Sequence, residues 1–247
     1  MRFSGCTVVV TGASRGLGRH LAVAFAREGA FVGLGHRAHP GEAEEALRAC
    51  RDAGGDGALL GFDVRDRDAA RHALGELDRS RQGIDVLVNN AGVHRDALFG
   101  AGSPDDWDEV LNVNVTGVYN CTHAVARPML ARRRGVILNV ASVSALRSTD
   151  GRAAYATSKS AVIGFTRSIA RELAPSGIRV NAIVPGYVDT GMAARLDWNK
   201  RKSAVEKIPL GRFATADEVS AAALFLASED ARYVVGHALI VDGGLSL

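Results

Sequence analysis

Short apolar, β-branched runs alternate along this chain with longer amphipathic stretches. The stretches with helical spacing of apolar residues cover residues 16–28, 42–53, 66–78 and 216–227. The apolar runs cover residues 7–10, 31–34, 58–62, 86–88, 136–140, 180–184 and 238–241. Alternating strands and helices build βαβ units, and strands that are apolar on both sides are typical of a parallel sheet covered by helices on both faces. The sequence therefore predicts an α/β fold with a doubly wound parallel sheet of about seven strands.

The length and composition of the chain fit one domain. Its 247 residues are 47% apolar and 23% charged, which is enough to bury a full core. We find no internal repeat, low-complexity tract or linker, so we expect a single domain over residues 1–247. Only residues 187–211 break the alternation, because this segment is long, charged and without a clean period; such a segment is often a lid. Its apolar residues Met192, Leu196 and Trp198 either cover a substrate or pack the lid down.

The charge and the cysteines argue against several classes of function. The formal net charge of +3 is spread along the chain, which gives little support to nucleic-acid binding. The spacing of Cys6, Cys50 and Cys121 matches neither a zinc site nor a disulfide framework, so we expect buried free thiols and no metal site. We find no run of 18 apolar residues and no signal-peptide core ahead of the first strand. We therefore expect a cytoplasmic protein that does not bind membranes.

The first predicted strand runs directly into a glycine-rich turn and then into a helix. The turn reads Thr-Gly-Ala-Ser-Arg-Gly-Leu-Gly over residues 11–18. Glycine lets the backbone approach a ligand closely, and a helix N-terminus presents unpaired N–H groups and the positive end of the helix dipole. An ordinary tight turn also uses glycine. The position after the first of several parallel strands nevertheless favours a pyrophosphate site in a Rossmann-type, dinucleotide-binding domain.

The end of the second strand indicates which dinucleotide binds. NAD-binding proteins place a carboxylate about 20 residues after the glycine turn, where it accepts hydrogen bonds from the ribose 2′-hydroxyl. Here the strand ends in Gly35, His36 and Arg37, without an acid. Arg37 and Arg15 can pair with a 2′-phosphate, although two solvent-facing arginines would look the same. We predict NADPH as the cofactor, with Asp63 either at the adenine edge or capping the following helix.

Three side chains have the types and spacing needed for proton transfer to a carbonyl. Tyr155 and Lys159 are four residues apart at the start of a helical stretch, so both project from one face. A phenol has a reference pKa near 10, and both a neighbouring ammonium and the cationic ring of an oxidised nicotinamide favour the phenolate. Ser142 follows the strand at 136–140, at the edge of the sheet where ligands bind. Its hydroxyl can hold the substrate oxygen while Tyr155 exchanges the proton.

Taken together, these motifs resemble those of the short-chain dehydrogenase/reductase family, and within it those of the 3-oxoacyl-[acyl-carrier-protein] reductases. The resemblance covers nearly the whole chain. Besides the glycine turn and the Ser, Tyr and Lys positions, the matching motifs are Asn89-Asn90-Ala91-Gly92, Asn112-Val113-Asn114, Pro185-Gly186 with Thr190, and Val241-Asp242-Gly243-Gly244. The resemblance implies a nicotinamide-dependent reductase that moves a hydride to a carbonyl.

The resemblance also implies a role for each matching residue. The catalytic tetrad would be Asn114, Ser142, Tyr155 and Lys159, with Asn114 in a helix kink holding a water that relays protons through Lys159. Because all four are present, a scaffold that binds NADPH without turnover is the least favoured alternative. The implied cofactor-binding residues are Gly12, Ser14, Arg15, Gly16, Leu17, Gly18, His36, Arg37, Asp63, Val64, Asn90, Ala91, Gly92, Tyr155, Lys159, Pro185, Gly186, Val188 and Thr190.

The substrate is less tightly specified than the chemistry. The resemblance implies a 3-oxoacyl thioester on an acidic acyl carrier protein, which Arg132, Arg133 and Arg134 would meet near the cleft mouth. Ser176 stands where such reductases carry a second docking arginine, and a solvated helix end explains the three arginines equally well. The charged segment at 143–152 suits a polar or bulky substrate. A polyketide or polyene ketoreductase, or a dehydrogenase of a sugar, steroid or other small alcohol, therefore stays open.

The expected assembly also follows from the resemblance. Such reductases form tetramers through the helices that bear the positions of Asn114 and Tyr155 and through the C-terminal strand. The apolar residues at 161–165 are consistent with a helix that packs against another copy. A buried core face would have the same pattern, so both readings stay open.

Overall fold

A seven-stranded parallel sheet forms the centre of the molecule. The computed structural model describes residues 1–191 and 197–247. The strand order is β3-β2-β1-β4-β5-β6-β7, and every neighbouring pair is parallel. The strands are β1 (Thr7–Thr11), β2 (Phe31–His36), β3 (Asp56–Gly61), β4 (Val86–Asn89), β5 (Gly135–Val140), β6 (Ile178–Pro185) and β7 (Ala238–Val241). The predicted α/β fold with about seven parallel strands is confirmed.

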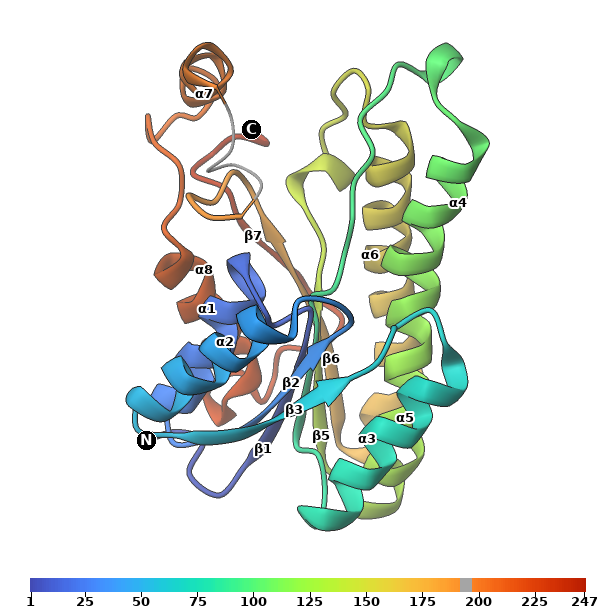
Figure 1. Ribbon diagram of the computed structural model, residues 1–247, viewed down its shortest axis with the longest axis vertical. Coiled ribbons are helices and arrows are strands. Elements are labelled where there is room, and N and C mark those ends of the chain that lie inside the picture. The colour runs from blue at the N-terminus through green and yellow to red at the C-terminus, as the bar shows by residue number, and fades with distance from the viewer. Residues whose placement is uncertain (192–196) are drawn as a thin grey trace.

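Helices cover both faces of the sheet in two layers (Figure 1). One layer holds α1 (Gly16–Arg27), α2 (Pro40–Asp52) and α8 (Ala216–Ala227). The other holds α3 (Arg67–Ser80), α4 (Pro104–Leu111), α5 (Gly117–Arg132) and α6 (Ala153–Leu173). The strands are almost wholly buried between the two layers, with all five residues of β1 inaccessible. Two large apolar clusters result, one on each face of the sheet.

Shorter helices lie beside the carboxyl edge of the sheet or join the longer ones. They are the 3-10 turns η1 (Phe99–Ala101), η3 (Val143–Ala145), η4 (Ala174–Ser176) and η6 (Glu229–Ala231), the π-helical turn η2 (Asn112–Thr116) and the helix α7 (Trp198–Val205). The η2 turn interrupts the path from α4 to α5, so that one long helix is kinked in its middle. Among the described residues, no helix combines the length and the apolar character that a membrane crossing requires.

The position of β1 beside β4 determines where a ligand can bind. The chain builds the sheet outward from β1 toward β3 and then returns to place β4 on the other side of β1. At such a reversal the connections leave in opposite directions, and a crevice opens beyond the carboxyl ends of the two strands. The turn at residues 11–18 and the loop that begins at Asn90 border this crevice.

A chain of buried polar side chains lies on one face of the sheet below this edge. Asn89 Nδ2 donates to Thr122 Oγ1 at 2.9 Å and to Asn139 Oδ1 at 2.8 Å. Asn139 Nδ2 in turn donates to Thr166 Oγ1 at 2.8 Å. All four residues are buried. The bonds therefore join β4 and β5 to α5 and α6 directly beneath the loops that carry the site.

We predict that Asn139→Ala destabilises the fold. The substitution removes two buried hydrogen bonds and leaves a small cavity, so the free energy of unfolding should fall by about 2–4 kcal/mol. Urea denaturation followed by circular dichroism measures the change. The control is Asn199→Ala on the exposed surface of α7, which should change the stability by less than about 0.5 kcal/mol. Equal midpoints for wild type and Asn139→Ala would contradict this role of the polar chain.

Candidate active site

Close contact between two loops forms the part of the crevice where a pyrophosphate can lie. Gly12 has φ +65°, and a Cβ there would lie 2.9 Å from Ala91 Cα. A Cβ at Gly18 would overlap the Gly12 carbonyl oxygen and Asn90 Nδ2. Asn90 Nδ2 donates to the carbonyls of Thr11 at 3.0 Å and Gly12 at 3.2 Å. The glycines thus allow the loop after β4 to contact the turn after β1.

The N-terminus of α1 points into the same region, and no acidic side chain of its first turn neutralises it. Its N-cap residue, Arg15, makes no side-chain capping bond, and the first turn holds no acidic residue. A Cβ at Gly16 would lie 3.5 Å from Gly191 Cα, so the segment after β6 approaches the turn from the opposite side. Backbone N–H groups and a helix dipole without a local carboxylate favour a bound phosphate group.

Arginines gather where the second strand ends. Arg37 Nη1 lies 3.7 Å from Asp63 Oδ2, and Arg65 Nη2 lies 2.7 Å from the same oxygen. The hydrogen bond from Arg65 lowers the pKa of Asp63, with burial acting in the opposite direction. The following helix is capped by Asp66, so the alternative that Asp63 caps it is wrong. Arg15 is 4.0 Å from Glu42, and the side chains of Arg15 and Arg37 are both more than half exposed.

The predicted catalytic side chains meet at the carboxyl end of β5. Ser142 follows this strand and accepts a hydrogen bond from Ser144 N at 3.2 Å. Tyr155 lies in the first turn of α6 and is buried, with 7% of its surface exposed. Lys159 lies one turn later on the same face, and its Nζ is 5.7 Å from the centroid of the Tyr155 ring. Lys159 Nζ donates to the Val140 carbonyl at 2.7 Å.

Asn114 lies in the π-helical turn η2 and is fully buried. Its amide pairs with both backbone groups of Val93, with Nδ2 donating at 2.9 Å and Oδ1 accepting at 2.8 Å. Nδ2 also donates to Ser158 Oγ on α6 at 3.0 Å. A Cβ at Gly92 would lie 3.2 Å from Asn114 Oδ1 and 3.5 Å from Lys159 Nζ. Glycine at this position therefore leaves room between these two polar groups.

Burial controls the ionisation of the two titratable groups in this cluster. Burial raises the pKa of Tyr155; the Ser142 hydroxyl and the charge of Arg152 act against it, and Asp96 acts with it. Burial also lowers the pKa of Lys159 to about 8. The Lys159 ammonium lies 5.7 Å from the centroid of the Tyr155 ring and donates to the Val140 carbonyl, so its effect on the Tyr155 pKa stays a prediction. Burial thus favours the neutral phenol of Tyr155, the form that can donate a proton.

Known proteins share both the sequence and the fold. A family model described as enoyl-(acyl carrier protein) reductase matches residues 12–246. The 3-oxoacyl-[acyl-carrier-protein] reductase FabG of Thermotoga maritima is 40% identical over 245 residues, covering 99% of each chain. The chain belongs to the short-chain dehydrogenase/reductase family. It is therefore an oxidoreductase that acts between CH–OH and C=O groups with a nicotinamide cofactor.

Solved structures of other family members superimpose closely on this protein. The 3-oxoacyl-[acyl-carrier protein] reductase of Brucella melitensis has a TM-score of 0.93 at 33% identity, covering 100% of this chain and 94% of that one. A candidate 2-deoxy-D-gluconate 3-dehydrogenase of Agrobacterium tumefaciens with bound NADP has a TM-score of 0.91 at 38% identity. That comparison covers 99% of this chain and 98% of the other. The family thus includes proteins named for acyl and for sugar-acid substrates.

The residues of this chain fit the nicotinamide dinucleotide that the family uses. A Cβ at Gly12 or Gly18 would push apart the two loops that border the cradle, and α1 presents its N-terminus there. His36 Nδ1 is buried at the ribose end without a hydrogen-bond partner among the described residues. Val64 is held by the bond from Asn120 Nδ2 to its carbonyl at 2.9 Å. These features are expected where a polar ligand completes the hydrogen bonding.

The segment after β6 approaches the cleft from the far side. The strand ends at Pro185, and a Cβ at Gly186 would lie 2.9 Å from Asp242 Cα. Val188 is bridged to Ala214, and Thr190 N donates to the Val188 carbonyl at 2.7 Å.

The predicted lid falls only partly within the described residues. Met192 and Leu196 lie outside them. Trp198 is 76% exposed at the start of α7, so it does not pack this segment down.

The three arginines at 132–134 do not lie near the cleft mouth of this chain, and that expectation is wrong. They precede β5, whereas Ser142 follows it, and six residues of extended strand span about 20 Å. Arg132 pairs with Asp78 at 3.0 Å and Arg134 pairs with Asp85 at 2.6 Å. Arg133 donates to the carbonyl of Pro175 at 3.0 Å. Ion pairs formed by the fold hold two of these arginines in place.

Sequence reasoning missed three charged or polar residues beside Tyr155. His94, Asp96 and Arg152 come from the loop after β4 and the start of α6, and they converge on the Tyr155 ring. The sequence signal was the unusual charge of residues 143–152, which was interpreted only as a property of the substrate cleft.

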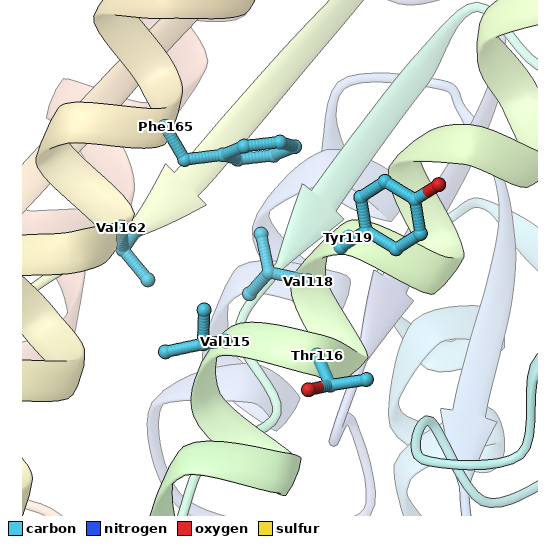
Figure 2. A pocket seen from close by; sticks show the side chains of 6 residues that line it. All are labelled: Val115, Thr116, Val118, Tyr119, Val162 and Phe165. Atoms are coloured by element: carbon cyan, nitrogen blue, oxygen red, sulfur yellow. The ribbon is translucent and has the colours of Figure 1, made fainter.

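An apolar hollow of about 310 Å³ lies on the outer side of α5 and α6, away from the catalytic side chains. Figure 2 shows the six side chains that line it, which are Val115, Thr116, Val118, Tyr119, Val162 and Phe165. Neither Ser142 nor Tyr155 is among them, so this hollow is not the substrate site. It marks an apolar surface on α5 and α6.

Proposed function

We propose that the protein reduces the 3-oxo group of an acyl thioester on acyl carrier protein to the 3-hydroxy group, with NADPH as the reductant. The observation that carries this proposal is the meeting of Ser142, Tyr155 and Lys159 at the carboxyl edge of the sheet. The full-length similarity to the Thermotoga maritima reductase supports the acyl substrate. Three free cysteines are consistent with the reducing environment of the cytoplasm, where we place the enzyme.

The geometry supports a direct division of roles. The Ser142 hydroxyl donates a hydrogen bond to the substrate carbonyl, and the neutral Tyr155 phenol delivers the proton to the same oxygen. When bound, the cofactor supplies the hydride to the carbonyl carbon. Lys159 and Asn114 lie on the inner side of Tyr155, where a proton can return from solvent to the phenolate through polar groups. Burial keeps the phenol protonated until the oxyanion forms.

The choice of NADPH rests on Arg37 and Arg15. Both are more than half exposed, and their carboxylate partners are 3.7–4.0 Å away, beyond hydrogen-bonding distance. A dianionic 2′-phosphate would bind these guanidinium groups more strongly than the distant carboxylates of Glu42 and Asp63 do. The Agrobacterium structure with bound NADP supports the same choice.

A second candidate function is the oxidation or reduction of a polar alcohol or sugar acid. The charged and polar side chains of His94, Asp96 and Arg152 beside Tyr155 favour it, because an acyl chain gains nothing from such groups. The candidate gluconate dehydrogenases among the similar structures are consistent with it. A ketoreductase of polyketide synthesis shares the acyl-thioester chemistry and differs only in the residues around the cleft.

We further propose that the enzyme is a tetramer in which α5 and α6 pack against another copy. The apolar hollow between Tyr119 and Phe165 leaves apolar surface uncovered on these helices (Figure 2). The last strand, β7, is at the edge of the sheet, and its Ile240 is 46% exposed. Apolar surfaces of this kind are typical of subunit interfaces.

The first prediction concerns turnover. NADPH consumption with acetoacetyl-acyl carrier protein should exceed that with acetoacetyl-coenzyme A and with free ketones. Tyr155→Phe should retain cofactor binding and lose at least about 99% of the turnover, because the proton donor is removed. Activity confined to free ketones or sugar acids contradicts the acyl-thioester proposal. Turnover near that of the wild type in Tyr155→Phe contradicts the role of the phenol.

The second prediction concerns cofactor preference. Wild type should have a lower KM for NADPH than for NADH, and Arg37→Ala should reduce that preference by about tenfold, because one charge-assisted bond to the 2′-phosphate is lost. Arg51→Ala is the control, since Arg51 also pairs with an aspartate but lies on the exposed surface at the end of α2. A tenfold preference of the wild type for NADH would refute the assignment.

The third prediction concerns assembly. Light scattering should give a mass four times the 26.0 kDa of one chain. Phe165→Glu should yield smaller species, because a charge would be buried in the interface. Trp198→Glu, which changes an exposed aromatic residue on α7, should leave the mass unchanged. A monomeric wild type, or a Phe165→Glu variant that stays tetrameric, argues against this interface.

A further inference from the structure

The loop after β4 is tied to the segment that precedes α6. Ala97 N donates to the Gly151 carbonyl at 3.0 Å. Asp96, which precedes Ala97, and Arg152, which follows Gly151, form an ion pair with 2.8 Å between Oδ2 and Nη2. Arg152 is the N-cap residue of α6; its guanidinium group, which can only donate hydrogen bonds, pairs with Asp96. These contacts join the two segments that flank Tyr155.

The same contacts place charged and polar side chains against the Tyr155 ring. The guanidinium carbon of Arg152 is 5.9 Å from the centroid of this ring. The imidazole of His94 approaches the ring edge-on, with centroids 6.2 Å apart, and its Nδ1 lies 3.1 Å from Asp96 Oδ1. Asp96 thus contacts Arg152 with one oxygen and His94 with the other. The side chains of Arg152 and His94 are 28% and 32% exposed, so the cluster lies at the mouth of the site.

Four charged or titratable groups face Tyr155 from the elements packed around it. Arg152 and Lys159 lie on its own helix, and His94 and Asp96 lie on the loop after β4. The Lys159 ammonium donates to the Val140 carbonyl. The charge of Arg152 lowers the pKa of Tyr155, and that of Asp96 raises it. Burial raises this pKa, and its effect is larger than that of either charge. Arg152 therefore supplies a partly exposed cation near the ring, whereas the Lys159 cation is buried.

We propose that Arg152, fixed by Asp96, is a positioning residue for Tyr155, whose charge favours release of the phenol proton and whose ion pair sets the start of α6. The inference rests on the proposed function, in which Tyr155 donates the proton. The two side chains are 28% and 44% exposed, and ion pairs this exposed add little to stability, so structural support alone explains the contact poorly. A charge about 6 Å away, at an effective dielectric constant of about 40 to 80, changes an acid dissociation constant by roughly threefold to tenfold.

The test measures the ionisation of Tyr155 directly. The chain has four tyrosines, so protein labelled with ¹³C at tyrosine Cζ gives a spectrum in which Tyr155→Phe identifies the Tyr155 signal. The titration of this signal is followed in the presence of saturating NADP⁺. Arg152→Gln should move its midpoint upward by about 0.5 to 1 pH unit, because the nearby positive charge is lost. Arg152→Lys keeps the charge and should stay closer to the wild type.

A turnover measurement gives the second readout. Reduction requires the protonated phenol, so the rate should fall as the pH rises through the Tyr155 pKa. Arg152→Gln should shift that fall to higher pH by the same amount as it shifts the titration. Arg171→Gln, at the exposed far end of α6, is the matched control and should change neither curve.

The outcomes separate this inference from the proposed function. The inference is overturned if the Tyr155 signal titrates with the same midpoint in wild type and Arg152→Gln, or if it titrates in neither protein. Equal shifts in Arg152→Gln and Arg152→Lys also overturn it, because they would reflect a loss of structure and not of charge. Absence of turnover with every ketone overturns the proposed function, and the NMR titration still reports on Arg152 in that case.

Discussion

The contact between the turn after β1 and the loop after β4 is the interaction on which the site depends. The Thr11 hydroxyl accepts hydrogen bonds from Asn90 N and Ala91 N, and Asn90 Nδ2 returns bonds to the carbonyls of Thr11 and Gly12. These bonds form because no side chain stands at Gly12 or Gly18. They place the phosphate cradle on one side of the crevice and direct the following loop, through Gly92, toward Asn114 and Lys159. The cofactor site and the catalytic site thus share one backbone connection.

Burial gives the catalytic groups their rigidity and also opposes their charge. Tyr155 and Lys159 lie between the sheet and the helices of one layer, so each has few conformations and few contacts with water. The same environment raises the pKa of Tyr155 and lowers that of Lys159 to about 8, because both charged forms lose solvation. A buried acid of this kind depends on charges at its periphery. Arg152, held by Asp96 at the mouth of the site, places such a charge 5.9 Å from the centroid of the ring.

Sequence periodicity predicted the elements better than their ends. All seven strands occur where apolar runs were found, because a strand covered on both faces must be apolar throughout. The observed ends of α2 and β3 differ from the predicted ones because local chemistry there outweighs the hydrophobic pattern. The second helix begins at Pro40, two residues earlier than its apolar period indicates, because proline is favoured in the first turn of a helix. The third strand begins at Asp56, where backbone pairing with Phe31 extends the ladder through an exposed polar residue.

The sequence by itself determined the fold and predicted which side chains gather at the candidate site. Strand ends in a parallel sheet meet at one edge, so Ser142, the glycine turn and the loop at Asn90 had to converge once the strands were recognised. Only the tertiary structure decided which charges face one another. Arg132 and Arg134 are held by Asp78 and Asp85, about 50 residues away in the chain, at the edge of the sheet opposite to the site. The pairing of Arg152 with Asp96 likewise joins two loops, and its direction depends on side-chain geometry that a sequence pattern does not encode. Periodicity follows from burial, which is local and repetitive, whereas an ion pair requires two particular side chains to meet in space.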